Sequence, residues 1–264
     1  MRRLLIGILC CWNFPAHAGA WLMPEGEGLA ITQLTHFTSD SYWDARGARQ
    51  SQDRFSKWEI QPYVEYGLTP NLTIGGSAYL QQVQQGGDKN RGIADPELFL
   101  RTIVWQRGAQ VVSLQPLIKL PSRFEHNESN PRGGSASTDA ELSLLYGHSL
   151  HLLSDRDYLD ARIGYRERTG NLNGQFKADI ALGLSPSQHW QLIPAARYVR
   201  ASIPEATPAF SESGELDYDL LKAELTIAYK LPSGNWLQAT CFDHVSGVQT
   251  GDGRGLSLGY AVRF

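Results

Sequence analysis

The sequence predicts an all-β, antiparallel up-and-down transmembrane β-barrel of about twelve strands, preceded by a cleavable signal peptide. Three observations carry this prediction. Polar and apolar residues alternate along most of the chain, turn-forming residues divide it at regular intervals, and it ends in an alternating apolar segment closed by Phe264. We therefore expect a signal peptide at 1–18 and an outer-membrane β-barrel at 19–264.

Residues 1–18 show the three parts of an export signal. Arg2 and Arg3 supply positive charge, an apolar run spans 4–12, and Ala16-His17-Ala18 places small residues at the cleavage-determining positions. Ala18-Gly19-Ala20 is a second possible site two residues later. Cleavage after Ala18 leaves Cys241 as the single thiol of the mature chain, so an intramolecular disulfide is excluded.

Composition excludes several classes of protein. Charged residues make up 19% of the chain and hydrophobic residues 42%, which is too apolar for a disordered protein. No apolar run reaches the roughly 18 residues of a membrane-spanning helix. The formal net charge of -3 argues against a nucleic-acid partner, because phosphate binding needs concentrated Lys and Arg. A folded β-rich protein remains.

Alternating polarity predicts the individual strands, because successive strand residues face opposite sides of a sheet. In 221–229, for example, Leu225 and Ile227 share one face, opposite Glu224 and Thr226. No helical segment interrupts the series, which disfavours a parallel βαβ fold. The predicted strands are about 28–38, 54–67, 71–83, 94–106, 109–120, 138–150, 157–168, 175–184, 188–200, 217–230, 235–246 and 254–264.

The connections are predicted to alternate in length. Short turns rich in Gly, Pro, Ser, Asp and Asn fall at 67–71, 106–108, 154–157, 185–187 and 232–235. The intervening connections are expected to be longer, polar loops at about 39–53, 84–93, 121–137, 169–174, 201–216 and 247–253. Short periplasmic turns and longer external loops are typical of outer-membrane barrels. An even strand number places both termini in the periplasm.

Aromatic residues beside the short turns predict an interfacial girdle facing the membrane lipids. They are Tyr66, Trp105, Tyr158, Trp190, Tyr229, Trp236 and Phe264. In the last strand Leu256, Leu258, Tyr260, Val262 and Phe264 share one face. This ending resembles the signal read by the barrel assembly machinery of Gram-negative cell envelopes. We expect that machinery and outer-membrane lipids as partners, and the bacterial outer membrane as the location.

If the apolar faces meet lipid, the other faces line the lumen. The predicted lumen-lining residues are Glu59, Glu65, Glu97, Arg101, Lys119, Glu141, Asp160, Arg162, Arg166, Lys177, Asp179, Arg197, Lys222, Glu224 and Arg263. Their seven acids and eight bases are almost balanced, which argues against a strongly ion-selective porin. Two interpretations are open: ion pairs that fill and stiffen a narrow barrel, or a polar conduit for a neutral or mixed-charge solute.

Three prolines fall inside predicted strands, at Pro62, Pro116 and Pro194. Proline removes a donor from the hydrogen-bonded ladder and is normally confined to edges or bulges. We expect local bulges or strand ends at these positions. A weakened seam that admits hydrophobic molecules from the lipid is the alternative.

Catalytic candidates are few. His244 and Ser246, in Asp243-His244-Val245-Ser246-Gly247, would share one face of a regular strand and form the best local pair for an outer-membrane lipid hydrolase. The Asn that follows Ser in the outer-membrane phospholipase pattern is missing. We predict no catalytic residues, no cofactor-binding residues, no cofactor and no metal ligands.

Four segments carry a resemblance to a known group. They are 20–28 (AWLMPEGEG), 65–73 (EYGLTPNLT), 112–115 (VSLQ) and 164–166 (GYR). The chain resembles the XagA-like outer-membrane proteins, and through them the barrels associated with the MetA pathway of phenol degradation. The resemblance covers most of the mature chain and implies a cell-envelope barrel for exopolysaccharide secretion or passage of organic compounds. It carries over no functional residues.

The leading hypothesis is therefore an outer-membrane channel or secretion accessory for exopolysaccharide or small organic solutes. In the first case, components of exopolysaccharide synthesis or secretion would be partners. The alternatives are an outer-membrane lipid hydrolase and a structural or surface-binding barrel. The last would act through its long loops at 39–53, 121–137 and 201–216.

Overall fold

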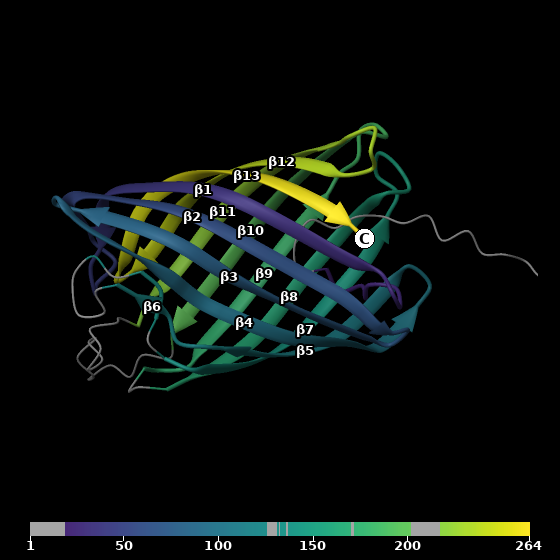
Figure 1. Ribbon diagram of the computed structural model, residues 1–264, viewed down its shortest axis with the longest axis horizontal. Helices are drawn as coiled ribbons and strands as arrows, with labels where there is room; N and C mark the ends of the chain where they lie inside the picture. Colours follow the sequence, from purple (N-terminus) through teal and green to yellow (C-terminus); the bar gives the residue numbers. More distant parts are fainter. Residues whose placement is uncertain (1–18, 126–130, 132, 136, 170–171, 202–216) are drawn as a thin grey trace, which may run out of the picture.

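Twelve strands close into an antiparallel barrel in the part of the chain that the computed structural model describes, which confirms the predicted fold class (Figure 1). The described residues are 19–125, 131, 133–135, 137–169, 172–201 and 217–264. The predicted signal peptide lies outside them. Among these residues no helix is long and apolar enough to cross a membrane. The barrel strands are β1 (Gly28–Trp43), β2 (Arg49–Thr69), β3 (Leu72–Gln85), β4 (Asp88–Arg107), β5 (Gln110–Lys119), β7 (Asp139–Leu150), β8 (Asp157–Arg168), β9 (Gln175–Gly183), β10 (Trp190–Ala201), β11 (Asp219–Lys230), β12 (Trp236–Val248) and β13 (Thr250–Arg263).

The ring closes between the first and last strands. β1 pairs with β13 from Leu29 opposite Arg263 to Trp43 opposite Thr250. The ladder continues into the terminal residue, since Gly28 and Phe264 exchange both of their backbone hydrogen bonds. A short strand β6 (Arg123–Phe124) extends the edge of β4 beyond the end of β5. The role of Phe264 in recognition by the assembly machinery stays a prediction.

The two faces of each strand differ as the alternation predicts. On β7, Leu142 and Leu144 are exposed on the outer face, whereas Glu141, Ser143 and Leu145 are buried inside. The same arrangement recurs around the ring and leaves large apolar side chains on the outside. A closed barrel with an apolar outer band is the architecture of bacterial outer-membrane proteins, and we place the chain in that membrane.

Leu144→Arg is expected to lower the free energy of unfolding in lipid vesicles by about 2–4 kcal/mol, because the substitution moves a charge into the hydrocarbon region. Leu144 is 43% exposed and lies mid-strand on the outer face. Leu152→Arg is the matched control, since Leu152 is 60% exposed but lies in the turn after β7. Urea titration of both variants measures the difference. Equal losses would show that the outer face of β7 does not meet lipid.

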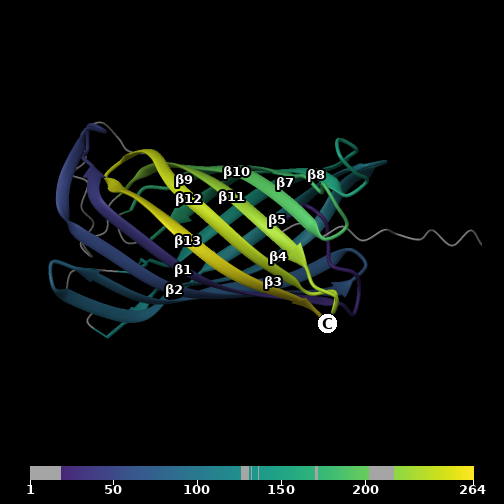
Figure 2. The same ribbon diagram turned by 90° about the horizontal axis from the view of Figure 1, so that it is seen from above.

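Three of the predicted long loops are wrong. Residues 39–53, 84–93 and 247–253 mostly continue the strands, so β1–β2, β3–β4 and β12–β13 form long hairpins with short turns. Figure 2 shows β1 and β2 rising beyond their neighbours at the end far from the C-terminus. Strand segments that extend into water are polar on both faces, so alternation loses its signal there. Turn chemistry was the remaining clue: Gly86 and Gly87 both have positive φ, as a two-residue hairpin turn requires.

The tip of the first hairpin is a tight turn rather than a long loop. Asp44 accepts hydrogen bonds from the backbone N–H groups of Arg46 at 2.8 Å and Ala48 at 2.9 Å. These bonds hold the pKa of the Asp44 carboxyl below its ordinary value. The described residues of the predicted loops at 121–137 and 169–174 lie outside the barrel strands, whereas Ala201 ends β10. Residues 202–216 of the third predicted loop lie outside the described residues.

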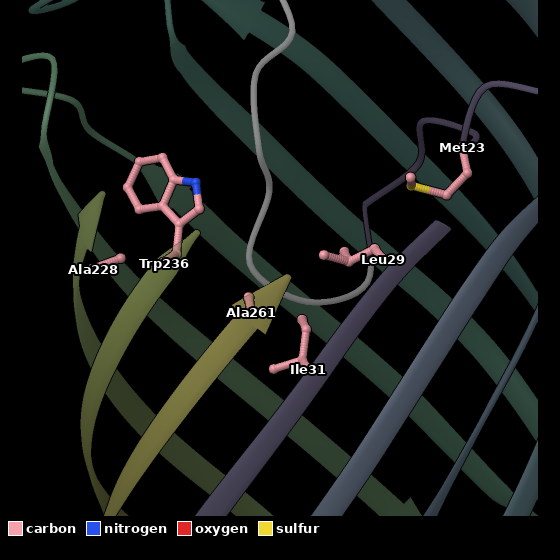
Figure 3. Packing of buried hydrophobic residues seen from close by; sticks show 6 residues of the cluster. All are labelled: Met23, Leu29, Ile31, Ala228, Trp236 and Ala261. Atoms are coloured by element: carbon pink, nitrogen blue, oxygen red, sulfur yellow. The ribbon is translucent and has the colours of Figure 1, made fainter. Parts of the chain in front are cut away.

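Two members of the predicted aromatic girdle point inward instead. Tyr66, Trp105, Trp190 and Phe264 are exposed on the outer surface. Tyr158 and Trp236 are buried, and Trp236 belongs to a small apolar cluster with Met23, Leu29, Ile31, Ala228 and Ala261 (Figure 3). The cluster lies inside the barrel at the end where β2–β3, β4–β5 and β11–β12 are connected and the chain ends at Phe264. We call this end the turn end and the opposite end the loop end. An aromatic residue next to a turn can point outward to the membrane interface or inward to the lumen. Tyr158 and Trp236 point inward because they pack against other residues inside the barrel.

Each of the three prolines predicted to lie inside strands interrupts one of its two ladders. Pro62 keeps its place opposite Thr32 of β1, but the β2–β3 ladder skips from Ile60 to Tyr63. Pro116 remains opposite Leu142 of β7 while the β4–β5 ladder is broken beside it, and Pro194 remains opposite Leu225 of β11 where pairing with β9 ends. These interruptions follow from the missing N–H of proline. The weakened-seam hypothesis stays a prediction.

Candidate functional site: the barrel lumen

A cavity of about 630 Å³ occupies the interior of the barrel. Of the residues predicted to line the lumen, those at its wall are Glu59, Glu97, Arg101, Asp160, Arg162, Arg166, Lys177, Asp179, Arg197, Lys222 and Glu224. The other four are buried or half-buried beside it and are ion-paired: Glu65 with Arg101, Lys119 with Asp139, Glu141 with Arg166, and Arg263 with Glu27. The volume is that of a small-molecule site.

A ladder of ion pairs runs across β7 to β11 on one side of the lumen. Glu141 is its centre, with its carboxylate 2.7 Å from Arg166 Nε and 3.1 Å from Lys177 Nζ. Arg162 pairs with Asp179 at 2.7 Å. The ladder ends where Glu224 contacts both Arg197 at 2.7 Å and Lys222 at 2.6 Å. Charges of opposite sign are therefore neutralised locally along this side, which we call the charged wall.

Aromatic side chains occupy the other side of the cavity, on β1 to β4 and β12. We call them the aromatic wall: Phe37, Phe55, Tyr63, Tyr79, Phe99 and Phe242. The rings of Phe37 and Phe242 are parallel with centroids 6.1 Å apart, and those of Tyr63 and Phe99 are also 6.1 Å apart. Lys222 Nζ lies 5.1 Å from the centroid of the Phe242 ring, so the two walls meet there. The lumen thus presents π faces opposite ion-paired groups.

Residues 19–27 cross the inside of the barrel at the turn end. We call this stretch the N-terminal segment. The backbone N–H of Ala20 donates to Asp160 on β8, and the Ala20 carbonyl accepts a bond from Ser113 on β5. Arg101 on β4 donates to the Trp21 carbonyl at 3.1 Å. The backbone N–H of Met23 donates to Thr73 on β3 at 2.9 Å. Four strands therefore hold this segment across the lumen.

Two glycines allow the N-terminal segment to pass. A Cβ at Gly67 would lie 2.0 Å from the carbonyl oxygen of Pro24, and the backbones of Gly67 and Gly26 are hydrogen-bonded at 3.0 Å. A Cβ at Gly147 would lie 2.7 Å from the Trp21 ring, which packs edge-on against Tyr158. A side chain at either position would displace the segment. Tyr158 thus faces inward, where its ring packs against the Trp21 side chain.

The loop end is narrowed by part of the 121–137 connection. Gly133 and Gly134 line the cavity, and a Cβ at Gly133 would lie 2.7 Å from the side-chain oxygen of Gln81 on β3. Asp95, which has a φ of 42°, accepts a hydrogen bond from the Ser135 backbone at 3.0 Å. Lys119 donates to the Ser135 hydroxyl. These contacts hold the described residues of this connection against the inside of the barrel.

The best hydrolase candidate is contradicted by the register of β12. His244 pairs with Lys222, whose side chain lines the cavity, while Ser246 pairs with Leu221 on the opposite face. A bulge at Val245 produces this inversion, so the two side chains do not share a face. His244 is engaged instead with the carbonyl oxygen of Gly251 at 2.7 Å. Among the described residues, no group of three or more His, Cys, Asp or Glu could hold a metal ion.

Sequence reasoning missed both the N-terminal segment and the aromatic wall. Residues 20–28 do not alternate in polarity, which marks them as non-strand but not as a segment inside the barrel. The sequence pattern predicted a location, the interfacial girdle, only for aromatic residues next to turns or at the C-terminus. Phe37, Tyr63, Tyr79 and Phe99 all stand at inward positions of their strands, so grouping aromatic residues by strand face could have found them.

Comparison with known proteins supports the fold. No family model matches the sequence, and no curated protein matches it significantly. The barrel is similar to an outer membrane channel from Pseudomonas putida F1, with a TM-score of 0.74, 14% identity and coverage of 92% of this chain and 97% of that one. It is also similar to the translocator domain of autotransporter NalP from Neisseria meningitidis, with a TM-score of 0.51, 13% identity and coverage of 90% and 88%. The chain has the fold of an outer-membrane β-barrel.

Proposed function

We propose that this barrel is an outer-membrane channel for small organic solutes that combine an aromatic or apolar part with polar groups. The observation that carries the proposal is the cavity of about 630 Å³ between the aromatic wall and the charged wall. Aromatic faces bind an apolar body by stacking, and ion-paired side chains offer both donors and acceptors to its polar groups. The Pseudomonas putida channel of the same fold supports a channel role.

The sequence resemblance leaves exopolysaccharide as the other cargo. A polymer in transit needs a continuous open path, whereas the N-terminal segment crosses the turn end and the 121–137 connection narrows the loop end. A cavity bounded in this way suits a small solute that moves between the two constrictions. We therefore favour small organic solutes over exported glycan.

Local neutralisation of charge favours a channel with weak ion selectivity. The ladder across β7 to β11 contains Glu141, Asp179 and Glu224 among its acids, each within 3.1 Å of a cationic group. A permeating ion of either sign therefore meets a compensated wall. Selectivity then depends on the size and shape of the solute and on its contact with the aromatic wall.

Flux of matched amino acids through reconstituted barrels tests the proposal. In liposome swelling, phenylalanine is expected to enter faster than leucine, and the trisaccharide raffinose to be excluded. Phe37→Ala and Phe242→Ala are expected to reduce the phenylalanine-to-leucine ratio by about twofold to tenfold, since one aromatic pair contributes about 0.5–1.5 kcal/mol. Leu34→Ala, on the outer face of β1, is the control and should leave the ratio unchanged. Absence of flux for every solute, or a ratio insensitive to both Phe variants, would contradict the proposal.

A further inference from the structure

One carboxylate oxygen beneath the N-terminal segment has no partner. Asp160 lies on β8 and is 5% exposed. Its Oδ1 atom accepts a hydrogen bond from the Ala20 backbone N–H at 3.3 Å, whereas its Oδ2 atom is buried without a hydrogen-bond partner among the described residues. A buried carboxylate is costly unless a cation or further donors compensate it. Among the described residues, the Oδ2 atom lacks the donor or cation that would compensate it.

The nearby arginine does not supply that cation. The Arg101 guanidinium is committed to Glu65 at 3.1 Å, to Gln115 at 2.9 Å and to the Trp21 carbonyl at 3.1 Å. Asp160 forms no ion pair with any side chain in the described part of the chain. Among the described residues, no side chain therefore compensates the Asp160 Oδ2 atom.

The backbone nitrogen of Gly19 is a candidate for this partner. Gly19 is buried and directly precedes Ala20, whose N–H already contacts Asp160. Consecutive backbone nitrogens lie about 3–3.6 Å apart, so the Gly19 nitrogen is within about 7 Å of Asp160 Oδ1. The freedom of glycine about φ and ψ allows a chain end at this position to turn toward Oδ2.

We propose that removal of the leader after Ala18 creates the missing partner, because the new α-ammonium group of Gly19 pairs with Asp160. Hydrolysis by the export peptidase breaks the Ala18–Gly19 peptide bond, and water supplies the hydroxyl of the new Ala18 carboxyl and a proton to the Gly19 amine. With an ordinary α-amino pKa of about 7.7–8.0, this amine takes up a further proton from solvent at neutral pH. Its three N–H donors then face a carboxylate that lacked one.

This pairing makes the seating of the N-terminal segment depend on processing. In the uncleaved chain the Gly19 nitrogen is a neutral amide and Asp160 stays uncompensated. In the mature chain the ion pair anchors the free end of the segment against β8, and Thr73, Arg101 and Ser113 hold the residues that follow. Closure of the turn end is thus completed only after export.

Reactivity of the Gly19 amine tests the pairing, in the mature barrel purified from outer membranes. Intact mass first locates the N-terminus, which is expected at Gly19. A water-soluble amine-acylating ester is then expected to leave the folded wild-type α-amine unmodified, while Asp160→Asn raises its rate of modification about tenfold or more. Asp252→Asn, which removes a carboxylate at the loop end, is the control and should retain the protection.

A second comparison covers the case in which Asp160→Asn does not fold. Chains that begin at Gly19 or at an added Met before Gly19 are refolded with Asp160 intact, both carrying Met23→Cys and Cys241→Ala. Maleimide labelling of residue 23 is expected to be faster in the chain with the added Met, because its ammonium group is displaced by one residue. A native N-terminus at Trp21, a freely reactive Gly19 amine in the folded barrel, or equal labelling of the two refolded chains would overturn the proposal. None of these readouts depends on solute flux.

Discussion

Glu141→Gln is expected to lower the free energy of unfolding by about 3–5 kcal/mol, the cost of removing one member of a buried ion-pair network. The side chain of Glu141 is fully buried and its carboxylate faces Arg162, Arg166 and Lys177. Glutamine keeps the shape but leaves three cations without their shared anion. Urea titration in lipid vesicles, followed by the gel shift between folded and unfolded barrel, measures the loss.

Glu27→Gln is the matched control for Glu141→Gln. Glu27 is half exposed and lies 3.9 Å from Arg263, so its removal is expected to cost about 0–1 kcal/mol. If the two variants were equally stable, the charged wall would be hydrated and flexible, and the ion pairs would contribute little to its rigidity.

Deleting residues 20–27 is expected to raise single-channel conductance severalfold. The segment spans the lumen between β3 and β8 at the turn end, so its removal opens that constriction while the strand ladders remain. Conductance in planar bilayers measures the change. Replacing the same residues by a Gly/Ser stretch of equal length is expected to act in the same direction, because the stretch lacks the Trp21 and Met23 contacts.

Met23→Leu is the control for this deletion. It retains an apolar side chain in the cluster with Leu29, Ile31 and Trp236 and should keep the wild-type conductance. A folded deletion variant with unchanged conductance would place the controlling constriction elsewhere, at the narrowed loop end.

The barrel could be predicted from sequence because lipid on the outside and a polar lumen on the inside select apolar and polar residues at alternate positions. Leu142 and Leu144 face lipid while Glu141 and Ser143 face the interior, and this pattern is readable without any knowledge of neighbouring strands. The same alternation predicted which charged residues face inward, and the structure places them at or beside the cavity. The hairpins beyond the apolar band were not predictable in this way, since water lies on both of their sides.

The relative orientation of His244 and Ser246 could not be predicted from the sequence of their own strand. His244 and Ser246 share a face in any regular strand, but β12 carries one residue more than β11 between them. A bulge depends on the register of two paired strands, so it cannot be predicted from the sequence of one strand alone. Ser246 consequently turns to the outer face.

The sequence by itself determined the fold class, the alternation of faces and the polar character of the interior, because each follows from residue type and spacing of two. Only the tertiary structure decided what occupies the interior. Ala20 meets Asp160 from 140 residues away and Met23 meets Thr73 from 50 residues away. Such contacts arise when the closed ring brings distant strands around one volume. Neighbouring residues in the chain cannot specify them, and they set both the constriction at the turn end and the proposed partner of Asp160.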